Sequence, residues 1–308
     1  MWNFSLLKAL AVWGRLAPLM VVRLVMFGLV ALVLGIAIGL GAWIGIRFQL
    51  VGGTADAVLG GSAAFLLAAV ALAIWGRARL QMLRSQLLAL VVDLVDGVRV
   101  PMGQGQIAHA RSAVAARFGS SSQLWAIHRF VRGVAGKVPA VAEGVGPLMS
   151  MPLLGRLASG GLVTQAVLAH AYRARPENAW EAAHDGLVMS TQNARDLLGT
   201  AGRINGVGWL LTLTLFLLLL PPFVGLAALW PAAGPTAGAI AAGLAALALR
   251  AALIQPLTLA CLWQAFLRIT AGQEPLGEWR GRLTQVSAPF RDLGDQAVGW
   301  SPDLAAVP

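Results

Sequence analysis

The residue with the clearest potential for chemistry is Arg250, which stands at the end of a long run of uncharged residues that begins at Ile204. Insertion scales place the cost of an arginine at the centre of a membrane helix at about 2.5–3.5 kcal/mol, and intramembrane charges often mark functional sites. Gln255, Pro256 and Gln264 follow on the same apolar stretch. We expect these four residues to form a polar site for a negatively charged or zwitterionic solute. The alternative is that Arg250 lies near a membrane surface and extends its side chain towards water.

The partner of Arg250 is the central question for this site. The apolar runs contain no acidic residue, so the partner is a backbone carbonyl, a side-chain amide such as Gln255, water, or a bound anion or zwitterion. Pro256 lacks an N–H group and therefore releases a carbonyl near Ala252, which Gln255 or a neighbouring helix could satisfy. Broken membrane helices occur at substrate sites, although a simple kink is the more common outcome.

Other motifs do not assemble into a catalytic or metal site. Glu181 and His184 have the Glu-x-x-His spacing of di-iron bundles, but only one copy is present. Gly103 and Gly105 lack the further glycine and the lysine of phosphate-binding loops. We therefore predict a protein that is not an enzyme and has no catalytic residues, metal or cofactor.

The composition predicts the elements that carry these residues. Of 308 residues, 58% are hydrophobic and 12% are charged, whereas soluble domains carry about 25% charged residues. Uncharged stretches extend over 24–46, 57–76 and 204–249. About 20 apolar residues cross a bilayer as a helix, so the last stretch is long enough for two crossings, with Pro221, Pro222, Pro231 and Pro235 as the break. We predict an all-α polytopic membrane protein with crossings at 24–46, 57–76, 207–229 and 237–258, plus amphipathic and cytoplasmic helices.

The same pattern divides the chain into four segments. These are 1–76, an interfacial helix and the first pair of crossings; 77–203, a mainly helical cytoplasmic or interfacial segment; 204–270, the second pair; and 271–308, an amphipathic helix over about 277–298 with a tail. Leucines from Leu80 to Leu94 and apolar residues from Leu124 to Val138 repeat every three or four positions, which is typical of packed helices. A helix is expected to end at Gly199 and Gly202. Within 140–172, an additional pair of crossings and a re-entrant or interfacial piece both remain open.

The charge distribution predicts orientation and partners. The net charge is +10, and residues 77–203 carry fourteen Arg or Lys against seven Asp or Glu. The positive-inside rule places this segment and both termini in the cytoplasm, in a bacterial inner membrane. Anionic lipid accounts for the basic charge, so we expect no nucleic-acid partner. A homo-oligomer or a partner membrane subunit is possible.

Part of the second half resembles a known group of proteins. The residues in question are Asn178-Ala-Trp-Glu-Ala-Ala-His-Asp-Gly-Leu, Gln255-Pro-Leu-Thr-Leu-Ala, Ala271-Gly-Gln-Glu-Pro and Phe290-Arg-Asp-Leu. They are similar to a group of uncharacterised bacterial multi-pass membrane proteins, and their order resembles the C-terminal half of choline transporter-like proteins. The resemblance implies a transport or channel component for a small solute. The alternative function is a non-catalytic scaffold or accessory subunit of a membrane complex.

Overall fold

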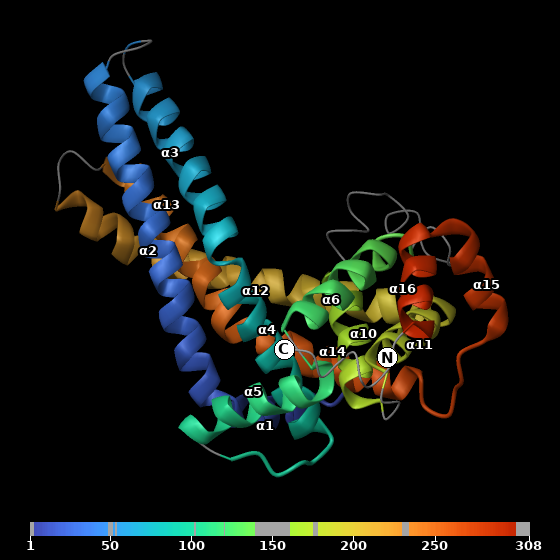
Figure 1. Cartoon of the computed structure of the whole chain (residues 1–308). Helices are drawn as coiled ribbons and strands as arrows, with labels where there is room; N and C mark the ends of the chain where they lie inside the picture. Colours follow the sequence, from blue (N-terminus) through green and yellow to red (C-terminus); the bar gives the residue numbers. More distant parts are fainter. Residues whose placement is uncertain are drawn as a thin grey trace. The chain divides into compact units, whose positions relative to one another are not determined.

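The computed structural model describes residues 3–48, 52, 54–101, 103–119, 121–138, 161–174, 178–229 and 234–299, and these form an all-α fold (Figure 1). Four of its helices are long and apolar enough to cross a membrane, so the predicted polytopic helical class is confirmed. The chain divides into two compact units. The hairpin unit comprises residues 19–83 and 208–255, and the helical unit comprises residues 1–18, 84–207 and 256–308.

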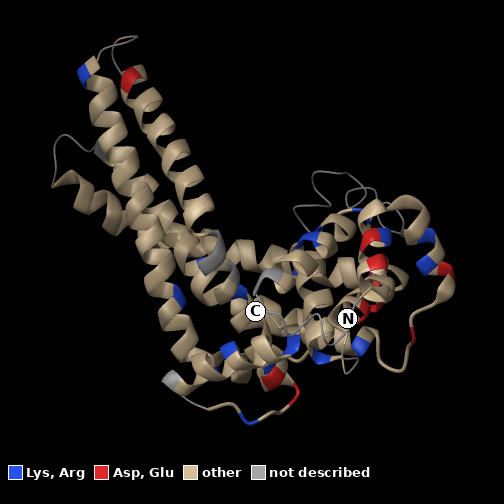
Figure 2. Ribbon diagram, in the orientation of Figure 1, with Lys and Arg blue, Asp and Glu red and all other residues tan. Residues whose placement is uncertain are grey.

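The first hairpin of the hairpin unit consists of α2 (Ala17–Phe48) and α3 (Thr54–Trp75), which lie side by side in Figure 1. Figure 2 shows both helices free of charge along most of their length. Glycines allow the two backbones to touch: a Cβ atom on Gly41 would overlap the carbonyl oxygen of Gly60, and one on Gly45 would overlap that of Asp56. Small residues permit this close approach in membranes, where dispersion rather than the hydrophobic effect holds helices together.

The second hairpin consists of the later part of α12 (Ala194–Ala228) and of α13 (Gly234–Leu249). A Cβ on Gly238 would lie 2.6 Å from the Cα of Val224, so these helices also meet through a glycine. Pro221 and Pro222 lie inside α12 and do not interrupt the helix, contrary to the sequence prediction. Proline is tolerated within membrane helices because neighbouring groups satisfy the carbonyls that it releases.

The helical unit is built from shorter helices that bury a core. They are α1 (Leu6–Arg15), α4 (Arg77–Val95), α5 (Gln104–Phe118), α6 (Ser121–Ala135), α10 (Gly161–Arg173), α11 (Ala179–Gln192), α14 (Gln255–Ile269), α15 (Gly277–Val286) and α16 (Ala288–Val298). Trp263 and Phe266 of α14 are fully buried and stack with ring centroids 5.5 Å apart. The ring of His170 meets Phe266 edge-on from α10, so α10 and α14 share this core.

The predicted apolar repeats are confirmed except at Leu80, the first leucine of the α4 repeat, which is only half-buried. Leu83, Leu87, Leu90 and Leu94 are buried along α4, and the repeat of α6 is buried from Leu124 to Val134. Within 140–172, residues 139–160 lie outside the described residues, and the rest belongs to α10. That helix has 13 residues and packs closely on α11, where His170 Cδ2 lies 3.1 Å from the position of a Cβ on Gly186.

Two helix boundaries differ from the prediction. The helix expected over 277–298 is two helices that meet at Ser287, because Pro289 cannot donate a backbone hydrogen bond and starts a new helix. Gly199 and Gly202 do not end a helix but lie within α12, and the boundary falls at Asn193. A helical glycine costs only about 1 kcal/mol relative to alanine, which the long apolar helix around it can offset.

The glycine contact between α2 and α3 leads to a test. Gly41→Ala should destabilise the folded protein by about 1–3 kcal/mol, because the added methyl group meets a backbone carbonyl that cannot move aside. Gly39→Ala is the matched control, since open space surrounds that position two residues away. Unfolding in mixed micelles measures both. Equal stability of the two variants would contradict the described packing.

Candidate functional site

The predicted site centres on a local change of helix geometry. Residues Arg250–Ile254 form one turn of π-helix between α13 and α14, and the N–H of Gln255 donates to the carbonyl of Arg250, five residues earlier. Pro256 follows directly. In this register an ordinary residue at 256 would donate to the carbonyl of Ala251, but proline has no N–H to give. Such single π-turns frequently occur at functional sites.

Arg23 supplies the missing donor. Its Nη2 atom donates to the carbonyl oxygen of Ala251 at 2.6 Å and to Oε1 of Gln255 at 3.0 Å. Arg23 belongs to α2 and is fully buried, and its guanidinium also lies 5.3 Å from the ring centroid of Phe27. A charged donor forms a stronger hydrogen bond than a neutral one, so this contact joins α2 to the π-turn.

Arg250 makes different contacts from those considered in the sequence. Its Nη1 atom donates to Oγ1 of Thr212 at 3.0 Å, and its guanidinium lies 4.0 Å from the ring centroid of Trp209. Trp209 and Thr212 are one turn apart on α12, and the Thr212 hydroxyl donates onward to the carbonyl of Gly208. Arg250 therefore joins the start of the π-turn to α12 through a hydrogen bond and a cation–π contact. Tryptophan is enriched where membrane helices meet the head-group layer.

The structure brings three of the four predicted residues together. The π-turn begins at Arg250 and is followed directly by Gln255 and Pro256. Gln264 belongs to the core of the helical unit. Oε1 of Gln264 accepts a hydrogen bond from the backbone N–H of Ser5 at 3.2 Å, just before α1 begins. This amide thus satisfies a helix N-terminus. Its Nε2 atom is buried and has no acceptor among the described residues.

Sequence reasoning missed Arg23, Trp209 and Thr212. Arg23 directly precedes the uncharged stretch 24–46, a position typical of a charge that flanks a crossing. Its neighbours Val21, Val22 and Leu24 are apolar, which was the available signal that the side chain lies inside a helix and not beyond its end.

A second group of polar side chains joins three helices of the helical unit. The carboxylate of Asp93 on α4 accepts hydrogen bonds from the Tyr172 hydroxyl of α10 at 3.0 Å and faces His109 Nε2 of α5 at 3.1 Å. Burial, followed by the charge of Asp93 and their hydrogen bond, raises the pKa of Tyr172. Tyr172 is therefore a neutral hydrogen-bond donor at neutral pH. The role that these contacts support for Asp93, Tyr172 and His109 is to stabilise the packing of α4, α10 and α5.

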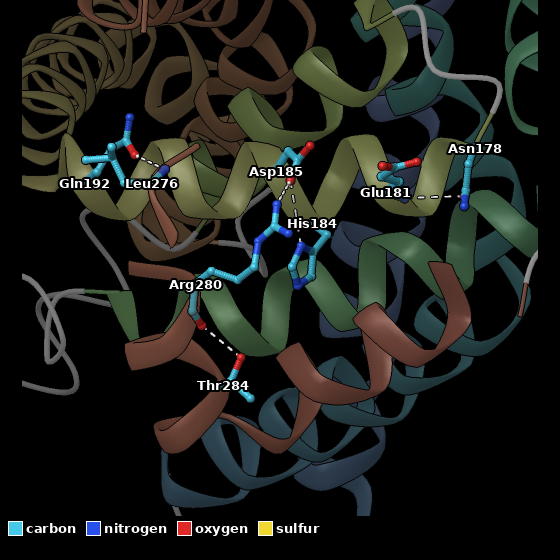
Figure 3. Close-up of polar contacts among 8 residues, drawn as sticks. All are labelled: Asn178, Glu181, His184, Asp185, Gln192, Leu276, Arg280 and Thr284. Atoms are coloured by element: carbon cyan, nitrogen blue, oxygen red, sulfur yellow. Dashed lines mark hydrogen bonds and ion pairs between the residues drawn. The ribbon is translucent and has the colours of Figure 1, made fainter. Parts of the chain in front are cut away.

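A third group surrounds α11 and is drawn in Figure 3. Asn178 caps this helix, since its Oδ1 accepts from the N–H groups of Trp180 and Glu181, while its Nδ2 donates to the carbonyl of Ala297 in α16. At the other end, Oε1 of Gln192 accepts from the N–H of Leu276. Both ends of α11 thus hold the segment 270–299.

The middle of α11 contacts the segment 270–299 through an ion pair between Asp185 and Arg280. Asp185 faces Arg280 Nη2 of α15 at 2.7 Å and His184 Nδ1 at 3.8 Å, as Figure 3 shows. His184 also stacks on Phe290 of α16, with centroids 4.1 Å apart. Burial by itself raises the pKa of Asp185, but His184 and Arg280 together lower it below its ordinary value. Among the described residues, no group of three His, Cys, Asp or Glu side chains is placed to hold a metal.

The Arg23 contact can be tested by a double-mutant cycle. Arg23→Leu should destabilise the protein by about 1–3 kcal/mol, because it leaves the half-buried carbonyl of Ala251 and amide oxygen of Gln255 without this donor. In a Pro256→Ala background the loss should be smaller, since the alanine N–H restores a backbone donor. Unfolding in mixed micelles gives the coupling, and strictly additive effects would contradict the assignment.

The Asp185 contact predicts a dependence on pH. Since the folded pKa is lowered, the stabilisation is complete above the ordinary value near 3.8 and is lost as pH falls through the folded pKa. The difference in thermal stability between wild type and Asp185→Asn should therefore be constant from neutral pH to about pH 4 and shrink below it. Glu278→Gln, which removes the exposed pair with Arg282, is the control and should change little. A constant difference down to pH 2 would refute the assignment.

Comparison of the chain with protein-family models, with curated proteins and with solved structures gave no match. The function must therefore be argued from the contacts described above.

Proposed function

We propose that this chain is a non-catalytic scaffold or accessory subunit of a membrane complex, in which two helical hairpins anchor a packed helical unit. The observation that carries this proposal is the contrast in burial between the two units. In the most apolar stretch of each of the first three crossings, only 6% of the residues are buried within the chain. These three crossings thus bury few side chains within the chain and leave the others at least partly exposed to lipid or to other protein, whereas 28% of the fourth is buried.

The arginines of the crossings support the same function. Arg23 completes the hydrogen bonding of the π-turn, and Arg250 binds Thr212 and Trp209. These contacts join the π-turn to both α2 and α12, and such connections between helices stabilise a membrane anchor. Their structural roles account for the presence of both charges without a solute.

A transport or channel component is the second candidate. The π-turn before Pro256 favours it, because interrupted membrane helices line the substrate sites of many transporters. The resemblance of the second half to choline transporter-like proteins points the same way. A solute path would then run beside Arg250 and Gln255 and would involve a partner subunit or a second copy of the chain.

For either function we propose that the helical unit faces the cytoplasm of a bacterial inner membrane, because the basic residues concentrate in 77–203. Ala55, which is exposed at the start of α3, would then lie on the opposite side. An Ala55→Cys variant in a Cys261→Ser background should react with an impermeant maleimide only from outside the cell.

Photo-crosslinking in native membranes tests the scaffold function. A photoreactive amino acid is placed in turn at Leu67, Ile74 and Leu218, which are 73%, 70% and 71% exposed. We expect at least one position to give a discrete protein adduct, because a scaffold must contact its complex. The buried position Leu262 serves as the control and should give none. Adducts with lipid alone at all three exposed positions would contradict the scaffold function.

Flux measurements separate the two candidates. Purified protein in liposomes should not increase the release of chloride, phosphate or choline if the chain is a scaffold. If it does, and Arg250→Gln abolishes the release while the protein stays folded, transport is the function and the scaffold proposal fails.

A further inference from the structure

One face of α6 is covered by basic and aromatic side chains. Trp125, His128, Arg129 and Arg132 are spaced at i, i+3, i+4 and i+7, so they line one side of the helix, which we name the α6 basic face. Arg129 and Arg132 are exposed, and Trp125 and His128 are half-buried. The guanidinium of Arg129 lies 5.0 Å from the ring centroid of Trp125, so this aromatic side chain and this charge form one surface.

The opposite face of α6 is committed to the core of the helical unit. Leu124, Ile127, Val131 and Val134 are at most 4% exposed. Phe130 meets Trp180 of α11, and Gly133 lies against Pro289 of α16. The helix therefore cannot insert an apolar face into a bilayer without unfolding the unit. Only its basic face is available to a partner.

Arg84 of α4 adds a third cationic side chain to Arg129 and Arg132, and its charge acts on His128. Burial, then the charges of Arg132 and Arg84, lowers the pKa of His128 to about 4. Partial burial and the charge of Arg132 also lower the pKa of Arg84, although that residue as a whole remains exposed. The arginines thus repel positive charge at His128, and an anion seated among them would relieve this repulsion.

The position of α4 in the chain indicates which anion is available. α3, an apolar membrane crossing, ends at Trp75, and α4 begins two residues later at Arg77. Arg84 lies seven residues further along α4, about 10 Å at the rise of an α-helix. Chain connectivity therefore keeps Arg84 within reach of the head-group layer. Basic segments next to a crossing typically attract anionic lipid.

We propose that the α6 basic face, together with Arg84, binds the phosphate head groups of anionic phospholipids. The charges and the tryptophan lie at the level of the head groups while the apolar face of α6 stays in the protein core. This site docks the helical unit on the bilayer surface, and it does so whether the chain is a scaffold or a transport component.

The chain contains four histidines, few enough for the NMR signal of His128 to be resolved and its pKa measured. The full chain, labelled with ¹³C-histidine, is placed in nanodiscs of phosphatidylcholine alone or with phosphatidylglycerol, and His128→Asn assigns the signal. We expect the pKa of His128 to be near 4 in phosphatidylcholine and to be higher with phosphatidylglycerol, because a phosphate offsets the charges of Arg132 and Arg84 while the burial of the ring remains. The same pKa in both nanodiscs would overturn the proposal. So would an equal rise caused by inorganic phosphate in phosphatidylcholine nanodiscs, because the ligand would then be free phosphate.

The titration of His128 near pH 4 requires that the protein stays folded in acid, so a second measurement is made at neutral pH. Native mass spectrometry counts the phosphatidylglycerol molecules that remain on the purified chain. The double variant Arg84→Gln, Arg132→Gln should retain fewer than wild type. Arg111→Gln, which removes an exposed charge from α5, should retain as many as wild type. Equal retention by the double variant and wild type would overturn the proposal, and so would an equal loss in the Arg111→Gln control.

Discussion

Every backbone polar group inside a bilayer must find a partner within the protein, and this constraint explains the contacts of the π-turn before Pro256. Pro256 removes one backbone donor, and the helix responds with a π-turn whose carbonyl at Ala251 takes its hydrogen bond from Arg23. A proline in one crossing thereby requires an arginine in another. This hydrogen bond and the second one to Gln255 contribute to the pairing of α2 with the last crossing, which also includes the contact of Gly35 with Leu244.

The two arginines of the long apolar helices illustrate how a charge can be stabilised by groups of the protein itself. Arg23 offers several N–H groups in one plane and can serve a backbone carbonyl and a side-chain amide together. Arg250 combines a hydroxyl acceptor with an aromatic ring, so its charge is stabilised without a carboxylate. In both cases the favourable contacts oppose the cost of removing the charge from water. The phosphate site on α6 differs, because there the cations repel one another and remain exposed.

The features that depend on local spacing could be predicted from the sequence. The four crossings follow from the length of uncharged stretches, and the buried faces of α4 and α6 follow from the three-and-four repeat of apolar residues. The partner of the proline-released carbonyl could not be predicted, because Arg23 and Ala251 are 228 positions apart. Gln264 was assigned to the polar site because it follows Pro256 on an apolar stretch. Spacing does not reveal that its Oε1 atom accepts a hydrogen bond from the backbone N–H of Ser5, 259 positions away.

The composition of the helical unit has a consequence for biosynthesis. This unit combines residues 1–18, 84–207 and 256–308, so two membrane hairpins interrupt it in the chain. The fully buried Trp263 and Phe266, as well as the segment that α11 holds at both ends, come from the last of these stretches. Domains usually fold as units while the chain emerges from the ribosome. Here the core cannot be complete before α14 has been synthesised, so part of the apolar surface of α10 and α11 stays uncovered until translation has passed the second hairpin.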